Sequence, residues 1–129
     1  MIRFYKTTNN IYAYAFSCLW YKRVTLGKKI EELTDVERAA AIFHEVGHVE
    51  QHHTEWRVIC LLFAPFLLKW LCRKQELDAD RYAAQYGHAQ GLLSLLANEW
   101  DGNFFQPSHA LRRASLERQD HSRPVPVTG

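Results

Sequence analysis

The sequence predicts an α+β fold that is mainly α, in which an N-terminal β-hairpin packs on a helical bundle. Residues 11–26 are rich in β-branched and aromatic side chains, as strands usually are. Residues 35–53 repeat apolar side chains at three- and four-residue spacing, and residues 73–87 divide into a charged face and a face of small apolar residues. A chain of 129 residues is long enough for one domain, 1–129, and has no room for a second.

The composition is that of an ordinary globular protein, with 47% hydrophobic and 23% charged residues. The net charge of +2 comes from interspersed residues of both signs, so we expect no nucleic-acid partner. Cys18, Cys60 and Cys72 are odd in number and widely spaced, which favours reduced thiols and a cytoplasmic location. Polar residues 7–10 interrupt the basic start of the chain, so no secretory signal is expected.

The first predicted element is a pair of strands within residues 11–26. Ile11–Phe16 and Leu19–Leu26 alternate aromatic and smaller side chains. A hairpin turn is expected near Ser17–Cys18 or slightly later. Gly27, followed by two lysines, ends the second strand.

The next element is a helix that begins at a capping box. Thr34 is a good N-cap, and Glu37 stands three residues further on, where its carboxylate can bond back to the cap. We expect the helix to run from Asp35 to His52 or His53. The apolar stripe that should face the core consists of Ala39, Ile42, Phe43, Val46 and Val49.

This helix carries the pattern His-Glu-x-x-His. His44 and His48 are four residues apart, so their imidazoles lie one above the other and can reach one ion. They project opposite the predicted apolar stripe, together with Ala41 and Glu37. Glu45 lies beside them, where a carboxylate could handle the proton of a metal-bound water.

A second informative helix is predicted over 73–87, where Gly87 is a typical C-terminal signal. Glu76 and Asp80 lie one turn apart on the face that carries the small apolar residues. Two carboxylates are costly to bury there without a cation. The same face also carries Leu77, Ala83, Ala84 and Gly87, and the solvent face carries Lys74, Asp78, Arg81 and Gln85.

The third metal ligand decides the type of site. Gln51 and Thr54 stand where a metzincin needs glycine and a third histidine, so that arrangement is excluded. His52 continues the row of His48, and three ligands in one straight row cannot surround a tetrahedral ion. We therefore expect His52 and His53 at the surface or behind the ligands, and Glu76 as the third ligand.

The most apolar stretch is 58–72, bracketed by Arg57 and 73–74 and interrupted by Pro65. Fifteen helical residues span only about 22 Å, against roughly 30 Å of bilayer hydrocarbon. A single crossing would also separate the two histidines from Glu76. A bent buried helix or helical hairpin is therefore expected, with no transmembrane span. Peripheral membrane contact through 58–72 is the alternative.

The C-terminal part should contain two more helices. Residues 92–100 form a short amphipathic helix, 101–103 a turn, and a last helix opens at Pro107–His109 and ends near Gln119. The proline-containing tail, about 120–129, has little to pack and is expected to be mobile. An inhibitory tail is the alternative.

These motifs together resemble the M48 peptidases, a gluzincin family of zinc metalloendopeptidases. The resemblance begins with His44–His48 followed by Glu76–Ala83, and covers roughly residues 10–118. The short length is similar to that of the single-domain minigluzincins. Further similar stretches are Val24–Gly27, Thr34–Glu37, Tyr86–Gly87 leading into Leu92–Leu96, and Pro107–Ser108 followed by Arg112.

The resemblance implies a zinc metallopeptidase that cleaves peptide or protein substrates. It implies one Zn²⁺ ion held by His44, His48 and Glu76, with water as the fourth ligand. Glu45 would be the general base. Asp80 would accept a hydrogen bond from a ligand histidine, and His44 is the expected donor. An extended substrate could lie along an edge strand formed within 11–26.

One departure from the family concerns Gln106, where a histidine usually precedes the matched proline. His109 is the candidate replacement, and Arg112 is a second candidate contact to the transition state or substrate. Two other functions stay open: a non-catalytic, zinc-stabilised binding or regulatory module, and a repressor-cleaving peptidase of the type found in mobile elements.

Overall fold

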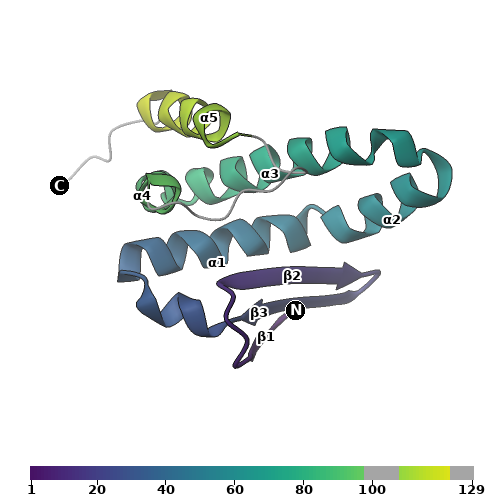
Figure 1. Cartoon of the computed structure of the whole chain (residues 1–129), viewed down its shortest axis with the longest axis horizontal. Coiled ribbons are helices and arrows are strands. Elements are labelled where there is room, and N and C mark those ends of the chain that lie inside the picture. The colour runs from purple at the N-terminus through teal and green to yellow at the C-terminus, as the bar shows by residue number, and fades with distance from the viewer. Residues whose placement is uncertain (98–107, 123–129) are drawn as a thin grey trace.

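A computed structural model of the chain describes residues 1–97 and 108–122. The α+β fold is confirmed: a three-stranded sheet packs against one side of α1, and α3 and α4 pack against the other side, with α5 beyond them (Figure 1). The strands are β1 (Ile2–Lys6), β2 (Ala13–Cys18) and β3 (Tyr21–Leu26). The helices are α1 (Asp35–Glu50), α2 (His53–Phe63), α3 (Leu68–Gln85), α4 (Ala89–Ala97) and α5 (His109–Ser122), with 3₁₀ turns η1 (Lys28–Glu32) and η2 (Pro65–Leu67).

The predicted hairpin is present as β2 and β3, which pair antiparallel along their whole length. The turn falls at Leu19–Trp20, slightly later than Ser17–Cys18, and Leu19 adopts a left-handed conformation with φ 52°. β1 was not predicted. It pairs with β3 in parallel, and such long-range pairing carries no local turn signal. The strand order β1-β3-β2 leaves β2 as an edge strand.

The capping box at the start of α1 is confirmed. The Thr34 hydroxyl accepts a hydrogen bond from the Glu37 backbone N–H (3.2 Å), and the Glu37 carboxylate accepts one from the Thr34 N–H (3.3 Å). The predicted end at His52 or His53 is wrong by two or three residues. α1 ends at Glu50 because His52 is left-handed, with φ 57°, and turns the chain into α2.

The predicted burial of α1 is also only partly right. Of the expected apolar stripe, Val49 is buried, whereas the other members are only half-buried. The opposite side of the helix is more deeply buried, including Glu37, Ala41, His44 and His48. The reason is that α1 is central: the sheet contacts one side and α3 and α4 contact the other. The histidines therefore lie inside the fold.

Small residues let the central helices approach closely. A Cβ on Gly47 of α1 would lie 3.0 Å from the Tyr82 Cβ and 3.2 Å from the Ala79 Cα of α3. This contact brings the histidine face of α1 against the carboxylate face of α3. The main buried core continues from it between α1, α3, α4 and α5 and comprises Ile30, Ala40, Ala41, Ala83, Ala84, Ala89, Leu92, Leu95, Leu96 and Leu116.

The apolar stretch 58–72 forms a helical hairpin, which was one of its two predicted forms. α2 and the first part of α3 are its arms, and the turn from Ala64 to Leu67 includes Pro65. The expectation that this segment is buried is wrong, because most of its large apolar side chains are exposed. Among the described residues, no helix is long and apolar enough to cross a membrane.

The end of α3 agrees with the sequence. Gly87 has φ 92°, and its N–H donates to the Ala84 carbonyl while the His88 N–H donates to the Ala83 carbonyl. This is a Schellman motif, which satisfies the last carbonyls of the helix. Of the predicted inner face, Ala83, Ala84 and both carboxylates are buried, Leu77 is half-buried and Gly87 is exposed.

The C-terminal helices are close to their predicted positions. α4 begins three residues before the predicted 92–100 helix. The part of that helix beyond Ala97, and the turn predicted at 101–103, lie outside the described residues. α5 begins at His109, as predicted. The tail predicted to be mobile from residue 120 is instead helical over its first three residues, and the remainder lies outside the described ranges.

Candidate metal centre

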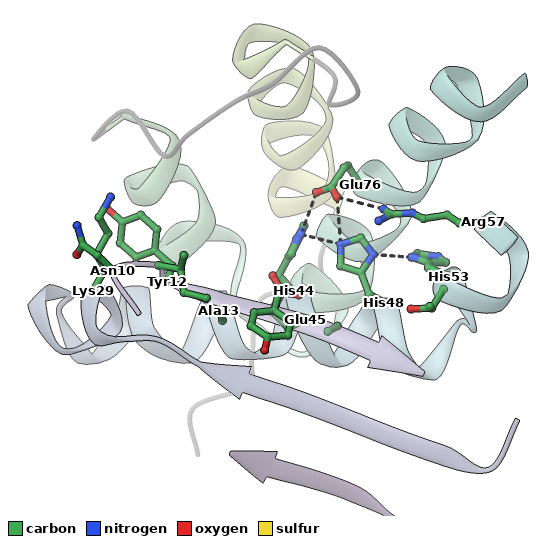
Figure 2. Close-up of a pocket in the computed structure, with 14 residues that line it drawn as sticks. Asn10, Tyr12, Ala13, Lys29, His44, Glu45, His48, His53, Arg57 and Glu76 are labelled. Atoms are coloured by element: carbon green, nitrogen blue, oxygen red, sulfur yellow. Dashed lines mark hydrogen bonds and ion pairs between the residues drawn. The ribbon is translucent and has the colours of Figure 1, made fainter. Parts of the chain in front are cut away.

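Three side chains from two helices form a group that could hold a metal ion. His44 and His48 come from α1 and Glu76 from α3, and all three are buried. The Nε2 atoms of the histidines are 3.1 Å apart. Glu76 Oε2 lies 3.1 Å from the His44 Nε2, and Glu76 Oε1 lies 3.2 Å from the His48 Nε2 (Figure 2). The donor atoms thus converge on one point, as the sequence predicted.

A buried chain of charged groups continues behind His44. Its Nδ1 is 2.8 Å from Asp80 Oδ1, which is the contact expected from the sequence. Arg112 of α5 donates two hydrogen bonds to the Asp80 carboxylate, from Nε and Nη2, both 2.8 Å long. Because Nδ1 faces a carboxylate, its proton is held there and Nε2 is directed toward Glu76.

The structure changes the predicted role of Arg112. We expected a contact with the transition state or substrate, but the side chain is only 2% exposed and lies behind Asp80. It does not line the pocket at the metal-binding group. Its position therefore does not support the predicted substrate contact, and the guanidinium compensates the buried Asp80 charge.

His109 is likewise not at the candidate centre. It lines a different hollow, between α4 and α5, together with Leu96 and Arg113. The prediction that it replaces the missing family histidine is therefore not supported by its position. Gln106 lies outside the described residues.

Glu45 faces the same pocket as the three candidate ligands. Its carboxyl group is buried, and this burial raises its pKa above the ordinary value, although His48 and His44 act in the opposite direction. A carboxyl group with a raised pKa can exchange protons nearer neutral pH than an exposed one can.

In the metal-free protein, the histidines and carboxylates share protons. Burial by itself lowers the pKa of His44, but hydrogen bonds to Asp80 and Glu76 outweigh it and raise the pKa to about 10. Burial by itself raises the pKa of Glu76, but the charge of His48 and hydrogen bonds from both histidines hold it well below its usual value. A bound cation would take over the compensating role that the His44 proton has here.

Sequence reasoning left the role of His53 open, and the structure gives it a specific position. His53 is buried at the start of α2, and its Nδ1 lies 2.7 Å from the Nδ1 of His48. Burial lowers the pKa of His53 to about 3, so the ring is neutral. It therefore orients His48 from behind. His52, by contrast, is exposed and pairs with Glu55.

The sequence did not indicate that Arg57 belongs to the site. It stood out only as the residue that precedes the apolar stretch 58–72. Its Nη2 lies 3.6 Å from Glu76 Oε1, and its Nε donates to the Gln75 side chain (2.5 Å). Figure 2 shows it on the α2 side of the cluster.

The pocket in front of the cluster has a volume of about 430 Å³. One wall is the edge strand β2 with the loop before it, from Asn10 to Ala15, and the opposite wall is α1 and α2. An extended chain could enter between an unpaired strand edge and the candidate ligands.

No family model, curated protein or solved structure matches this chain. The resemblance to M48 peptidases therefore stays a prediction that depends on the motifs and on the geometry described above.

Removing Glu76 should abolish metal binding. Wild-type protein should purify with, or take up, about one divalent ion per chain, and Glu76→Ala should retain little, because two imidazoles alone bind a divalent ion weakly. Elemental analysis after dialysis measures the ratio. Glu50→Ala, on an exposed carboxylate of the same α1 helix, is the control and should keep the metal. Full metal content in Glu76→Ala would contradict the assignment.

Removing the His53 ring should weaken metal binding without abolishing it. His53→Ala leaves His48 without the partner that fixes its orientation, and we expect an affinity about 10- to 100-fold lower. Competition with a chelating indicator measures it. His52→Asn is the matched control, because its side chain is exposed and asparagine tolerates the left-handed backbone there. Equal affinities in the two variants would contradict the role of His53.

Arg112→Met should destabilise the fold. It leaves the fully buried Asp80 carboxylate without its guanidinium, and breaking a buried pair costs about 3–5 kcal/mol of the free energy of unfolding. Urea unfolding of metal-free protein measures the change. Arg113→Met, at the exposed neighbouring position, should change it by about 0.5 kcal/mol or less. If both variants unfold alike, Arg112 does not compensate Asp80.

Proposed function

We propose that this protein is a zinc-dependent metalloendopeptidase that hydrolyses peptide bonds. The observation that carries the proposal is the convergence of His44, His48 and Glu76 at 3.1–3.2 Å, with Glu45 facing the same pocket. A ligand set of two histidines and one glutamate is that of known zinc peptidases.

The donor spacing fits zinc. Tetrahedral zinc with ligands at 2.0–2.1 Å has neighbouring ligand atoms about 3.3 Å apart, close to the three measured separations. Two imidazoles and one carboxylate leave a fourth position, and the pocket beside the cluster has room for water and substrate. The Asp80 and His53 contacts hold the two rings from behind, as ligand histidines in metal sites require.

The proposed chemistry is addition of water to a peptide carbonyl. When bound, zinc supplies Lewis acidity, which polarises the carbonyl and lowers the pKa of water to about 7. Glu45 takes one proton from the attacking water and gives it to the nitrogen as the C–N bond breaks, so the products are a carboxylate and an amine. The raised pKa of Glu45 suits both transfers.

The substrate backbone is proposed to lie along β2. β2 is an edge strand, and its residues Ala13, Tyr14 and Ala15 line the pocket opposite Glu45. Main-chain hydrogen bonds to this edge would bind an extended peptide with little dependence on its sequence. Bound in this way, a peptide would pass in front of the two histidines.

Glu45→Gln should keep the metal and lose peptide cleavage, with kcat falling by at least about 10²-fold. The amide keeps the shape of the side chain but cannot accept the proton. Cleavage of a quenched peptide library, with metal content measured on the same samples, checks this. The conservative variant Glu50→Gln should retain activity.

The same assay distinguishes the alternatives. A wild-type protein that binds zinc and unfolds on chelation, yet cleaves no peptide, would be the non-catalytic zinc-stabilised module. A protein that cleaves only folded repressor-type substrates would be the mobile-element type of peptidase. Retained cleavage in Glu45→Gln would exclude the proposed base.

Arg57 is our candidate for stabilising the oxyanion, since His109 lies elsewhere and the Arg57 guanidinium is at the cluster. Arg57→Met should lower kcat by about 10²-fold, with a much smaller change in KM, and Arg57→Lys should restore part of the loss. Steady-state kinetics at constant metal content measure both. A change confined to KM would instead indicate a role in substrate binding.

A further inference from the structure

The end of the α2–α3 hairpin is apolar and exposed. Leu62, Phe63 and Phe66 are 71%, 81% and 82% exposed. The first two end α2, and Phe66 lies in the turn between the two arms. Figure 1 shows this turn at the end of the molecule opposite α4 and α5. Exposed apolar residues are common singly, but a contiguous group on a projecting turn indicates a contact surface. Val58, Ile59, Leu61, Leu67 and Trp70 extend the exposed apolar surface along the arms.

Within the hairpin sequence the charges all have one sign, although Lys74 pairs with Asp78 (3.0 Å) and Arg57 lies 3.6 Å from Glu76, both just outside that stretch. The twenty residues from Trp56 to Gln75 contain no aspartate or glutamate. They contain four basic residues, and these follow the apolar positions along both arms: Arg57, Lys69, Arg73 and Lys74. An apolar tip with a basic surround is complementary to a surface that is apolar inside and anionic outside.

The positions of the two tryptophans indicate how deeply this surface would enter a membrane. Trp56 is seven residues before Phe63, and Trp70 is four residues after Phe66, so they lie about 10 Å and 6 Å below the tip. Both are more than half exposed. Tryptophan is enriched at the boundary between hydrocarbon and headgroups. A depth of about 10 Å is also that of segments which lie in the interface without crossing it.

We propose that the α2–α3 hairpin docks the protein on an anionic lipid membrane. Leu62, Phe63 and Phe66 enter the acyl region. The two tryptophans lie at the headgroups with Lys69, Arg73 and Lys74. A second copy of the chain is the less suitable partner, because two such tips would bring like charges together. This proposal does not depend on zinc or on the proposed peptidase activity.

A second turn extends the docking end. β2 ends beside the start of α2, where the Ser17 backbone N–H donates to the Thr54 hydroxyl (3.3 Å). The β2–β3 turn that follows carries Leu19 and Trp20, both strongly exposed, and it points toward the same end of the molecule as the hairpin (Figure 1). The pocket residues Thr54 and Arg57 belong to the arm that docks, so the pocket would lie near the membrane surface.

Vesicle co-sedimentation of the full chain tests the proposal. Wild-type protein should bind vesicles of phosphatidylcholine with 30% phosphatidylglycerol, and bind vesicles of phosphatidylcholine alone much more weakly. Phe63→Ser with Phe66→Ser should weaken binding at least about 10-fold, since two large side chains leave the acyl region. The control Val36→Ser with Leu111→Ser removes two exposed apolar side chains from α1 and α5 and should bind as wild type does.

The charge contribution is measured separately. Each of Lys69→Gln and Lys74→Gln should weaken binding to anionic vesicles about fivefold and reduce its salt dependence. Circular dichroism and the unfolding midpoint should stay close to wild-type values in all variants. The altered apolar residues and Lys74 are exposed, and the half-buried Lys69 is replaced by another polar side chain.

Three results would overturn the proposal. They are absence of wild-type binding to anionic vesicles, equal binding by the tip variant and the control variant, and a wild-type dimer in sedimentation equilibrium that the tip variant loses. The last result would assign the tip to contact between two copies of the chain.

Discussion

The structure depends on how α1 and α3 compensate the charges that they bury together. Asp80 is fully buried and Glu76 nearly so, in a helix contact that is otherwise made largely by alanine and glycine. Neither carboxylate could be buried there alone. Arg112 and His44 compensate Asp80, and the two histidines compensate Glu76. The arrangement of α1, α3 and α5 and the geometry of the candidate centre therefore follow from one set of contacts.

This coupling explains why the sequence predicted the candidate centre better than it predicted burial. Spacing alone places His44 above His48 and Glu76 above Asp80. Because buried carboxylates need a donor or a cation nearby, Glu76 and Asp80 are expected to lie against the two histidines. Burial along α1 was mispredicted because an apolar stripe assumes one covered face, whereas the central helix is covered on two. The contacts of His53, Arg57 and Arg112 were not predictable, since each depends on a turn or helix contact that no local pattern encodes.

The errors in the strands and the hairpin have a similar origin. β1 has mostly exposed side chains and pairs in parallel with β3, so it has neither an alternating buried face nor a turn signal. The stretch 58–72 is apolar on all sides, which led to the expectation of burial. Two antiparallel arms can cover only one side of each other, and the remaining apolar side chains are exposed. The high hydrophobicity of 58–72 indicated an apolar contact, but it does not distinguish a contact within the chain from one with a partner outside it.

The candidate centre requires the base of the α2–α3 hairpin but not its tip. The chain must leave α1 after His48 and return with Glu76, and contacts near the base of the hairpin fix this return: Gln75 donates to the His53 carbonyl (3.0 Å), and Arg57 donates to Gln75. The turn from Ala64 to Leu67 lies beyond these contacts, together with Leu62 and Phe63 at the end of α2. Polar residues would serve equally well to close that turn and would avoid exposing apolar surface to water. The apolar tip therefore has a reason other than folding, and contact with a lipid surface supplies one that its charges also fit.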